Sequence, residues 1–266
     1  MTLLSVLGIS LLLMTFSSHG QQSLTIATTT STDNSGLLTV LNEAYQQATQ
    51  TKVNVVAVGT GKALKIGRQG DVDVVLVHAP AAEKAYVAQG WFIDRVPVMQ
   101  NDFVIIGPLD DPAQLQQYHA TDKALAALMQ QPYRFISRGD DSGTHKKELF
   151  LWGKTLPAGE WYIEAGQGMG AVITMADQMQ AYTLTDRGTY IAFADKVALK
   201  VVHEGTPPLL NPYHVMAVNP AKHPHIDYQQ AKNYIDFLTG PIGQKLIGEF
   251  RIKEQVLFYP NNTDKN

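Results

Sequence analysis

The first third of the chain alternates continuous apolar runs with segments of helical periodicity. The apolar runs predict buried strands, because strands covered on both faces lack polar alternation. These runs are Leu24–Ala27, Val53–Val58 and Val72–Val77. Apolar residues recur at helical spacing in Gly36–Ala48, and Lys62–Arg68 predicts a short helix. This order of strands and helices predicts an open α/β sheet with right-handed crossovers.

A second α/β stretch follows and suggests two lobes. Phe103–Ile106 is expected to be a strand that leads out of the first unit, and the second stretch has expected strands at Phe135–Ser137 and Ile191–Phe193. Its expected helices are Thr121–Gln130, Thr144–Trp152 and Gly170–Ala181. The chain then closes with an expected strand, His214–Val218, and expected helices at Tyr228–Leu238 and Pro241–Ile247. We expect the chain to cross between lobes near Ile105–Pro108 and again near His203–Pro208. One lobe would then comprise residues 21–106 plus 207–266, and the other residues 107–206, with a ligand in the cleft between them.

The N-terminus predicts export. Leu3–Phe16 is almost entirely apolar, and its length suits the core of a signal peptide but is short for a membrane span. Ser18 and Gly20 place small residues at the −3 and −1 positions of a cleavage site before Gln21. Residues 1–20 are therefore expected to be a signal peptide, although no Lys or Arg precedes the apolar core. A buried N-terminal helix is the alternative.

Charge and composition exclude several classes of function. The formal net charge is −3 and no run of Lys or Arg occurs, which argues against a nucleic-acid partner. There is no cysteine, which excludes disulfides, thiolate metal sites and cysteine nucleophiles. The eight histidines are scattered without the spacing of a metal-cation site. A chain of this charge can bind an anion only through local donors.

Three turns share a design that suits an oxyanion. In each, a predicted strand leads through Gly, Ser or Thr residues into a helix N-terminus: Thr28–Gly36, Gly59–Gly61 and Arg138–Thr144. Such turns present backbone N–H groups, hydroxyl donors and the positive end of a helix dipole. The alternative for any single turn is ordinary helix capping. The hypothesis of an anion site depends on having such turns in both predicted lobes.

The third turn carries the strongest candidates. Arg138, Ser142 and Thr144 can place a guanidinium and two hydroxyls around one anion. The alternative is a surface arginine paired with Asp140 or Asp141. Two further segments are weaker: Gly166–Gly170 could add N–H donors or form a plain turn, and Asp186–Thr189 could add a charge near the cleft or form a hairpin-like turn.

Two classes of enzyme fit the sequence less well than a binding protein does. Gly59-Thr60-Gly61-Lys62 lacks both the first glycine and the final Ser or Thr of a nucleotide-binding P-loop. Ser142 and His145 suggest an exported serine hydrolase, but the sequence around Ser142 is not a Gly-x-Ser-x-Gly elbow. We expect His145 on the exposed face of its helix. The chain is therefore predicted not to be an enzyme.

At these turns the sequence resembles a known family. Thr28-Thr29-Thr30-Ser31 is similar to the TTTS signature of tungstate-binding periplasmic proteins, the receptors of a tungstate ABC importer. Further matching segments span nearly all the mature chain, and they are Val58–Leu64, Asp73–Pro80, Asn101–Phe103, Ser137–His145, Gly168–Gly170 and Ala181–Thr189. The resemblance implies an α/β type II periplasmic-binding-protein fold, with two lobes around a central ligand cleft.

The resemblance also implies the ligand, the site and the partners. The expected oxyanion-binding residues are Thr30, Ser31, Thr60, Arg138, Ser142 and Thr144. No cofactor is expected, the ligand is tungstate or else molybdate, and the partner is the membrane permease of an ABC importer. We expect a periplasmic monomer.

Elementary chemistry narrows the choice of anion only in part. Tungstate, molybdate and sulfate are unprotonated dianions that need only donors, whereas phosphate keeps a proton and favours a carboxylate acceptor. Asp140 and Asp141 therefore leave a phosphate receptor open, and a carboxylate facing the cleft would weaken the tungstate interpretation. Tungstate and molybdate have the same charge and nearly the same shape, and only the resemblance chooses between them.

Overall fold

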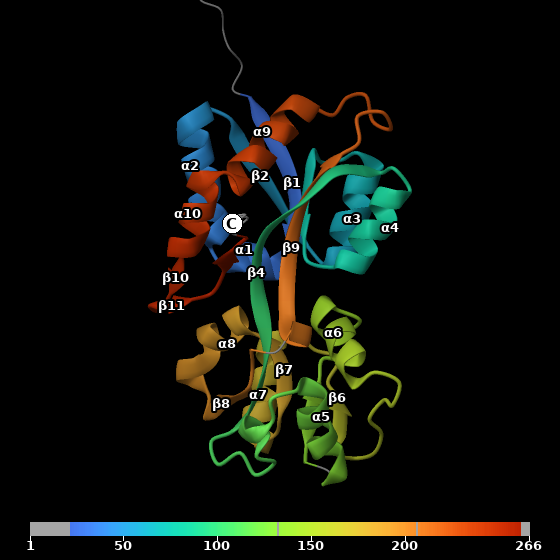
Figure 1. The fold of residues 1–266 in the computed structure, drawn as a ribbon, viewed down its shortest axis with the longest axis vertical. Coiled ribbons are helices and arrows are strands. Elements are labelled where there is room, and N and C mark those ends of the chain that lie inside the picture. Colours follow the sequence, from blue (N-terminus) through green and yellow to red (C-terminus); the bar gives the residue numbers. More distant parts are fainter. Residues whose placement is uncertain (1–21, 132, 206, 262–266) are drawn as a thin grey trace, which may run out of the picture.

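The computed structural model describes residues 22–131, 133–205 and 207–261, which form two α/β lobes stacked along the long axis (Figure 1). The predicted signal peptide, residues 1–20, lies outside the described residues. No helix in these ranges has both the length and the apolar character that crossing a membrane requires.

The first lobe is built on three parallel strands. These are β1 (Ser23–Thr29), β2 (Lys52–Val58) and β3 (Val74–Val77), with β1 between the other two. The helices that connect them or follow them are α1 (Thr30–Asn34), α2 (Leu37–Thr49), α3 (Thr60–Gln69) and α4 (Pro80–Ala88). The order predicted for the first third of the chain is thus confirmed.

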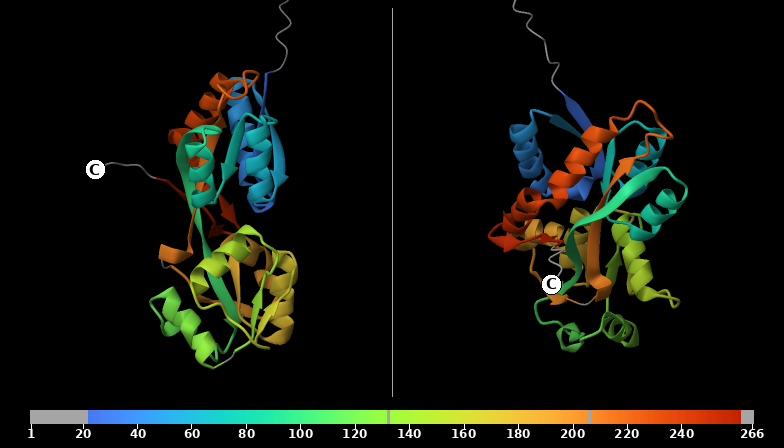
Figure 2. Two further views of the ribbon diagram at one scale, coloured as in Figure 1. Left: turned by 90° about the vertical axis from the view of Figure 1, so that its right-hand side faces the viewer. Right: turned by 45° about the horizontal axis from the view of Figure 1, so that its top comes forward.

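Two long strands join the lobes. Strand β4 (Phe92–Pro108) pairs with β9 (Leu210–Val218) up to Asp102, and from Phe103 onward it pairs with strands of the second lobe. Figures 1 and 2 show both strands running from one lobe toward the other. The first crossing therefore lies inside a continuous strand and a few residues before the predicted segment Ile105–Pro108. The proposed lobe limits, 21–106 plus 207–266 and 107–206, remain a prediction.

The second lobe is built from the elements that lie between β4 and η3 in the chain. Its strands are β5 (Phe135–Ser137), β6 (Tyr162–Glu164), β7 (Thr183–Asp186) and β8 (Leu199–His203). Its helices are α5 (Thr121–Gln130), α6 (Gly143–Trp152), α7 (Met169–Met179) and α8 (Arg187–Phe193), with 3₁₀ turns η1 (Leu115–Gln117) and η2 (Ala194–Lys196).

The chain then returns to the first lobe through η3 (Pro207–Leu209) and β9. Its last elements are α9 (Tyr228–Thr239), α10 (Pro241–Glu249), β10 (Arg251–Ile252), β11 (Gln255–Val256) and β12 (Tyr259–Pro260).

Strand alternation divides each lobe's core into two layers. In β3, Val74 and Leu76 belong to the cluster beneath α2 and α9, whereas Val75 and Val77 belong to the cluster beneath α3. In β4, Phe103 and Ile105 join the cluster of α5, while Val104 and Ile106 join the cluster of α7. Helices thus cover both faces of each sheet, as the continuous apolar strands predict.

Strand direction determines where a site can form. Strand β4 runs toward the second lobe, and β3 runs the same way because both are antiparallel to β9. Strands β1 and β2 are parallel to β3, so all three end at the interlobe face. Strand β7 is antiparallel to β4 and therefore ends at the same face from the other side. The carboxyl ends of the strands in both lobes face each other.

Two predictions of secondary structure were wrong. Ile191–Phe193 was expected to be a strand but lies in α8, whose start is capped by Asp186 accepting a hydrogen bond from the Thr189 N–H at 2.8 Å. Thr28–Gly36 was expected to be a turn, but Thr28 and Thr29 complete β1 and Thr30 begins α1. At α8, capping by Asp186 outweighs the β propensity of the residues that follow. At the end of β1, pairing with β2 extends the strand through Thr29, whose side chain then caps α1.

Two glycines of α3 give a matched test of this packing. A Cβ on Gly67 would lie 2.5 Å from Val75 Cγ2 and 2.7 Å from Phe92 Cε1, while a Cβ on Gly61 would meet no atom within 4 Å. We expect Gly67→Ala to lower the free energy of unfolding by about 1–3 kcal/mol through overpacking. Gly61→Ala should leave it unchanged or raise it by up to about 1 kcal/mol through helix propensity. Urea unfolding without ligand measures both, and equal effects would contradict the packing described.

Candidate functional site

The interlobe edge of the first lobe collects polar residues from three neighbouring strands. Thr29 at the end of β1 is in register with Val58 at the end of β2, and Thr28 is in register with Leu76 of β3. The residues that follow these ends therefore lie along one edge: Thr30 after β1, Thr60 after β2 and His78 after β3.

The first turn presents hydroxyl groups at the start of α1. Thr29 caps this helix by accepting a hydrogen bond from Thr32 N–H at 3.3 Å, and its hydroxyl also lies 2.6 Å from that of Thr32. Thr29 and Thr32 are buried, while Thr30 and Ser31 are exposed. The Ser31 hydroxyl lies 3.2 Å from that of Thr29. The buried Thr29 and Thr32 thus anchor the segment in which the predicted ligand-binding residues Thr30 and Ser31 are exposed.

The second turn leaves a helix N-terminus open. Thr60 is the first residue of α3, and the preceding residue, Gly59, has an extended backbone and makes no side-chain cap. The first-turn N–H groups of α3 therefore have no capping side chain. The Thr60 side chain is partly buried and lies at the edge that faces the second lobe.

The third turn contains an ion pair. A guanidinium N–H of Arg138 donates to Asp140 Oδ2, and Ser142 N–H donates to Asp140 Oδ1 at 3.2 Å. Burial would raise the pKa of Asp140, but hydrogen bonds from Ser142 and Arg138 outweigh it and lower the pKa below its usual value. Asp141 is exposed and pairs with Lys146 at 3.2 Å. The structure therefore has the pairing of Arg138 with Asp140 that was the alternative to an anion site.

Backbone geometry at this turn requires glycine. Gly139 has φ of +58°, and a Cβ there would lie 2.8 Å from Glu164 Cβ on β6. Gly143 begins α6 opposite the first lobe, and a Cβ on it would lie 3.7 Å from His78 Cε1 and 3.9 Å from Thr60 Oγ1. The first turn of α6, with Ser142 and Thr144 on either side of Gly143, therefore closely approaches the ends of β2 and β3.

Ser142 and His145 do not form a nucleophile and base pair. Ser142 Oγ accepts a hydrogen bond from the backbone N–H of His145 at 3.2 Å as the N-cap of α6. The His145 ring instead accepts from Asp141 N–H at Nδ1, at 3.0 Å. His145 is partly buried and its Nε2 is fully buried, so the prediction that it lies on an exposed face was wrong.

The segment Asp186–Thr189 begins α8 instead of forming a hairpin turn, and its arginine, Arg187, is paired. Arg187 donates to Asp102 at both oxygens, with distances of 2.7 and 2.6 Å, and also pairs with Glu204. Hydrogen bonding to Asp102 raises the pKa of Arg187 further above its usual value. The guanidinium thus fixes α8 to β4 at the point where that strand changes partners.

Sequence reasoning missed one residue at the interlobe edge. His78 was noted only within a matched segment, yet its ring lies against Tyr213 with centroids 4.6 Å apart and its Nδ1 lies 3.0 Å from Asn211 Oδ1. Its Nε2 is buried and has no hydrogen-bond partner among the described residues. The signal that could have identified it is its position directly after β3, equivalent to Thr30 after β1.

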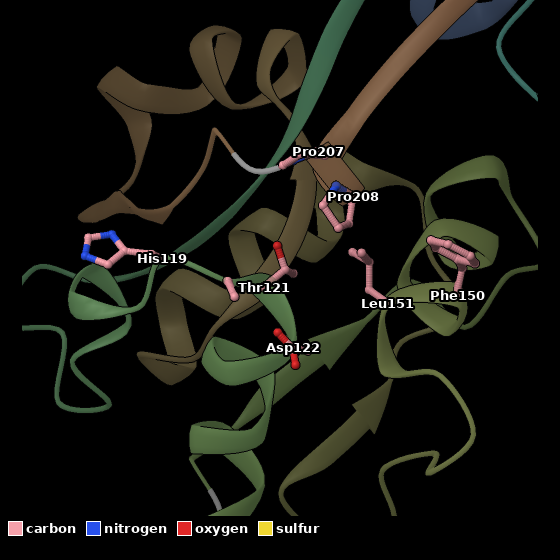
Figure 3. Close-up of a pocket in the computed structure, with 8 residues that line it drawn as sticks. His119, Thr121, Asp122, Phe150, Leu151, Pro207 and Pro208 are labelled. Carbon is pink, nitrogen blue, oxygen red and sulfur yellow. The ribbon is translucent and has the colours of Figure 1, made fainter.

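A cavity elsewhere is separate from these turns. It has a volume of about 290 Å³ and is lined by residues of α5, α6 and η3, including Thr121, Leu151 and Pro208 (Figure 3). None of the six predicted oxyanion-binding residues lines it. Across the described ranges there is also no cluster of three or more His, Cys, Asp or Glu side chains that could hold a metal cation.

Comparison with known proteins gives consistent matches over most of the chain. Residues 17–241 match the model of the PBP superfamily domain. The chain is 46% identical to the tungstate-binding protein TupA of Peptoclostridium acidaminophilum, over 90% of this chain and 86% of that protein.

Two solved structures agree with these matches. One is the tungstate-binding protein TupA of Desulfovibrio alaskensis, with a TM-score of 0.86 and 43% identity, covering 90% of this chain and 99% of the other. The other is described as the tungstate ABC transporter from Geobacter sulfurreducens, with a TM-score of 0.77 and 52% identity, covering 86% of this chain and 98% of the other.

The arrangement around Ser142 predicts that this hydroxyl is not an activated nucleophile. We expect a serine-reactive fluorophosphonate to leave the protein unlabelled, because His145 Nδ1 accepts from Asp141 N–H and Ser142 Oγ is hydrogen-bonded to the His145 backbone N–H and not to its ring. Intact-mass spectrometry after incubation measures the labelling, with an active serine hydrolase in the same tube as the positive control. Stoichiometric modification of Ser142 would contradict this account.

Proposed function

Because the chain belongs to the PBP superfamily, and within it to the family of the tungstate-binding proteins, we propose that it is a periplasmic receptor that captures tungstate for import by an ABC transporter. It acts by binding and release, without a chemical step. The membrane permease of that importer is its partner, and the protein works as a monomer.

The approach of two donor-rich turns across the lobes supports this function most strongly. Gly143 lies close enough to the first lobe that a Cβ on it would be 3.9 Å from Thr60 Oγ1. Both α3 and α6 begin at this approach, so their N-terminal partial positive charges face a common space. We propose that tungstate occupies this space, with Thr30 and Ser31 contributing from the neighbouring strand end.

The two carboxylates of the Arg138 turn favour a fully deprotonated anion. Asp140 accepts at both of its oxygens from groups of its own turn, and Asp141 is exposed and paired with Lys146. Both carboxylates therefore already accept from donors close in sequence, which makes them weaker acceptors for the proton of a hydrogen phosphate. A dianion that needs only donors suits this turn better than phosphate does.

Arg138 has donors left for the ligand. Its pairing with Asp140 uses one terminal nitrogen, while its Nε–H is buried without a hydrogen-bond partner in the described part of the chain. A buried unpaired donor is costly, and an anion that accepts from it removes that cost. We propose that Arg138, Ser142 and Thr144 hold the ligand from the second lobe, while Thr30, Ser31 and Thr60 hold it from the first.

Calorimetric titration of the mature, ligand-free protein tests the ligand. We expect tight one-to-one binding of tungstate, with sulfate and phosphate at least about tenfold weaker, a difference of about 1.4 kcal/mol. Molybdate, which shares tungstate's charge and nearly its shape, is the competitor to titrate next. Binding of phosphate in preference to tungstate would replace the proposed ligand. Absence of binding to tungstate, molybdate, sulfate and phosphate alike would contradict the receptor function.

Substitution of Arg138 tests the site. Arg138→Ala should weaken tungstate binding by about 2–5 kcal/mol, because a buried charge-assisted partner is lost. Arg138→Lys should also weaken it, because a point charge does not reproduce the planar guanidinium. Arg134 is exposed and directly precedes β5, the strand that Arg138 follows. Arg134→Ala is therefore the matched control and should bind tungstate like the wild type. A change of less than about threefold in Kd for Arg138→Ala would reject the assigned site.

A further inference from the structure

His78 places an unused ring nitrogen beside the proposed anion position. It directly follows β3, and a Cβ on Gly143 would lie 3.7 Å from its Cε1, the carbon between the two ring nitrogens. The ring therefore faces the first turn of α6, next to Thr60. Its Nε2 is buried and makes no hydrogen bond with any described residue.

A network of amides sets the protonation of this ring. Asn211 Nδ2 donates to Asn101 Oδ1 at 2.7 Å, which directs Asn211 Oδ1 toward His78 Nδ1 at 3.0 Å. An amide oxygen can only accept, so Nδ1 carries the hydrogen. In the neutral ring Nε2 therefore carries a lone pair and no hydrogen, because a neutral imidazole has a single N–H. A lone pair cannot donate to an oxyanion.

The free protein favours this neutral form. Burial lowers the pKa of His78 below its usual value of about 6.5. The groups around it partly compensate: Asn211 on β9 accepts from Nδ1, and Asp186 at the end of β7 and Glu83 on α4 favour the cation, while Lys147 on α6 opposes it. His78 is thus neutral near pH 7 before a ligand enters.

The proposed anion position has little compensating charge. A tetrahedral dianion brings two negative charges, and the nearest proposed cation, Arg138, is already paired with Asp140. Desolvating a dianion against neutral donors and one guanidinium that is already paired leaves the charge of the dianion poorly balanced. A ring that can take a proton at that point supplies both a positive charge and an N–H donor.

We propose that His78 is a further oxyanion-binding residue that takes up a proton from solvent when tungstate binds. The proton adds to the Nε2 lone pair, and the resulting Nε2–H donates to an oxygen of the anion while Nδ1–H stays bonded to Asn211. The proposal depends on the proposed function, since it assigns a role within the same site. Binding then couples each anion to one proton.

The coupling has a defined dependence on pH. The dianion raises the pKa of His78 in the complex above that of the free protein. Between these two pKa values, binding takes up close to one proton, and tungstate affinity falls by up to about tenfold for each unit of rise in pH. Below the lower value and above the higher one, affinity from this source does not change with pH.

Calorimetry in buffers that differ in ionisation enthalpy measures the proton directly. Tungstate is titrated into the mature protein at one pH between 7 and 8 in several such buffers, and the slope of observed enthalpy against buffer ionisation enthalpy gives the protons taken up. We expect a slope approaching one proton per anion. His78→Gln should reduce the slope to near zero, weaken binding about tenfold or more, and remove the pH dependence. His119→Gln, an exposed histidine of the second lobe, should match wild type.

A second variant separates protonation from folding. Asn211→Asp keeps the His78 ring but places a carboxylate at Nδ1, which favours the imidazolium before binding. Its proton uptake should therefore fall while the histidine remains. Circular dichroism establishes that each variant is folded.

The outcomes distinguish this inference from the function on which it depends. Tight tungstate binding with no proton uptake in wild type overturns the role of His78 and leaves the receptor standing. Proton uptake that persists unchanged in folded His78→Gln also overturns it. Absence of tungstate binding in wild type overturns the proposed function, whereas uptake lost in His78→Gln and kept in His119→Gln supports the proposal.

Discussion

The pairing of β4 with β9 is the interaction on which the rest of the structure depends. Strand β4 pairs with β9 in the first lobe and with β7 and β8 in the second, so one strand belongs to both sheets. At the change of partners, Asn101 and Asn211 face each other across the pair and their amides are 2.7 Å apart. The next residue, Asp102, accepts hydrogen bonds from Nε and one terminal nitrogen of Arg187. These contacts fix the strand directions that bring two sets of carboxyl ends together.

The interlobe face that results is rich in donors but nearly balanced in charge. Arg138 is paired with Asp140, and Arg187 is shared between Asp102 and Glu204. At the proposed site, backbone N–H groups, hydroxyls and helix N-termini therefore act as donors beside Arg138. Such preoriented donors suit a protein whose formal net charge is −3, because they act only at short range.

The sequence predicted the strands and helices of the fold better than it predicted the pairing of polar side chains. Strands such as β1 and β5 and helices such as α5 follow from apolar periodicity, which depends on local sequence. Ile191–Phe193 was assigned wrongly because the Asp186 cap precedes it and decides its conformation. The pairing of Arg138 with Asp140 could be weighed but not decided, since both alternatives use the same residues. His78 depends on its contact with Asn211, 133 positions away, which no local pattern contains.

The close approach at Gly143 has a mechanical consequence. A Cβ at this position would already be in van der Waals contact with His78 and Thr60, so the two lobes are separated there by about one methyl group. The lobes have little room to approach further at this point, so a larger movement there must carry them apart. A side chain at position 143 would fill the gap next to Thr60 and His78 and hold the two turns farther from each other. The smallest residue in the turn thereby sets how closely the two lobes can approach beside the proposed anion position.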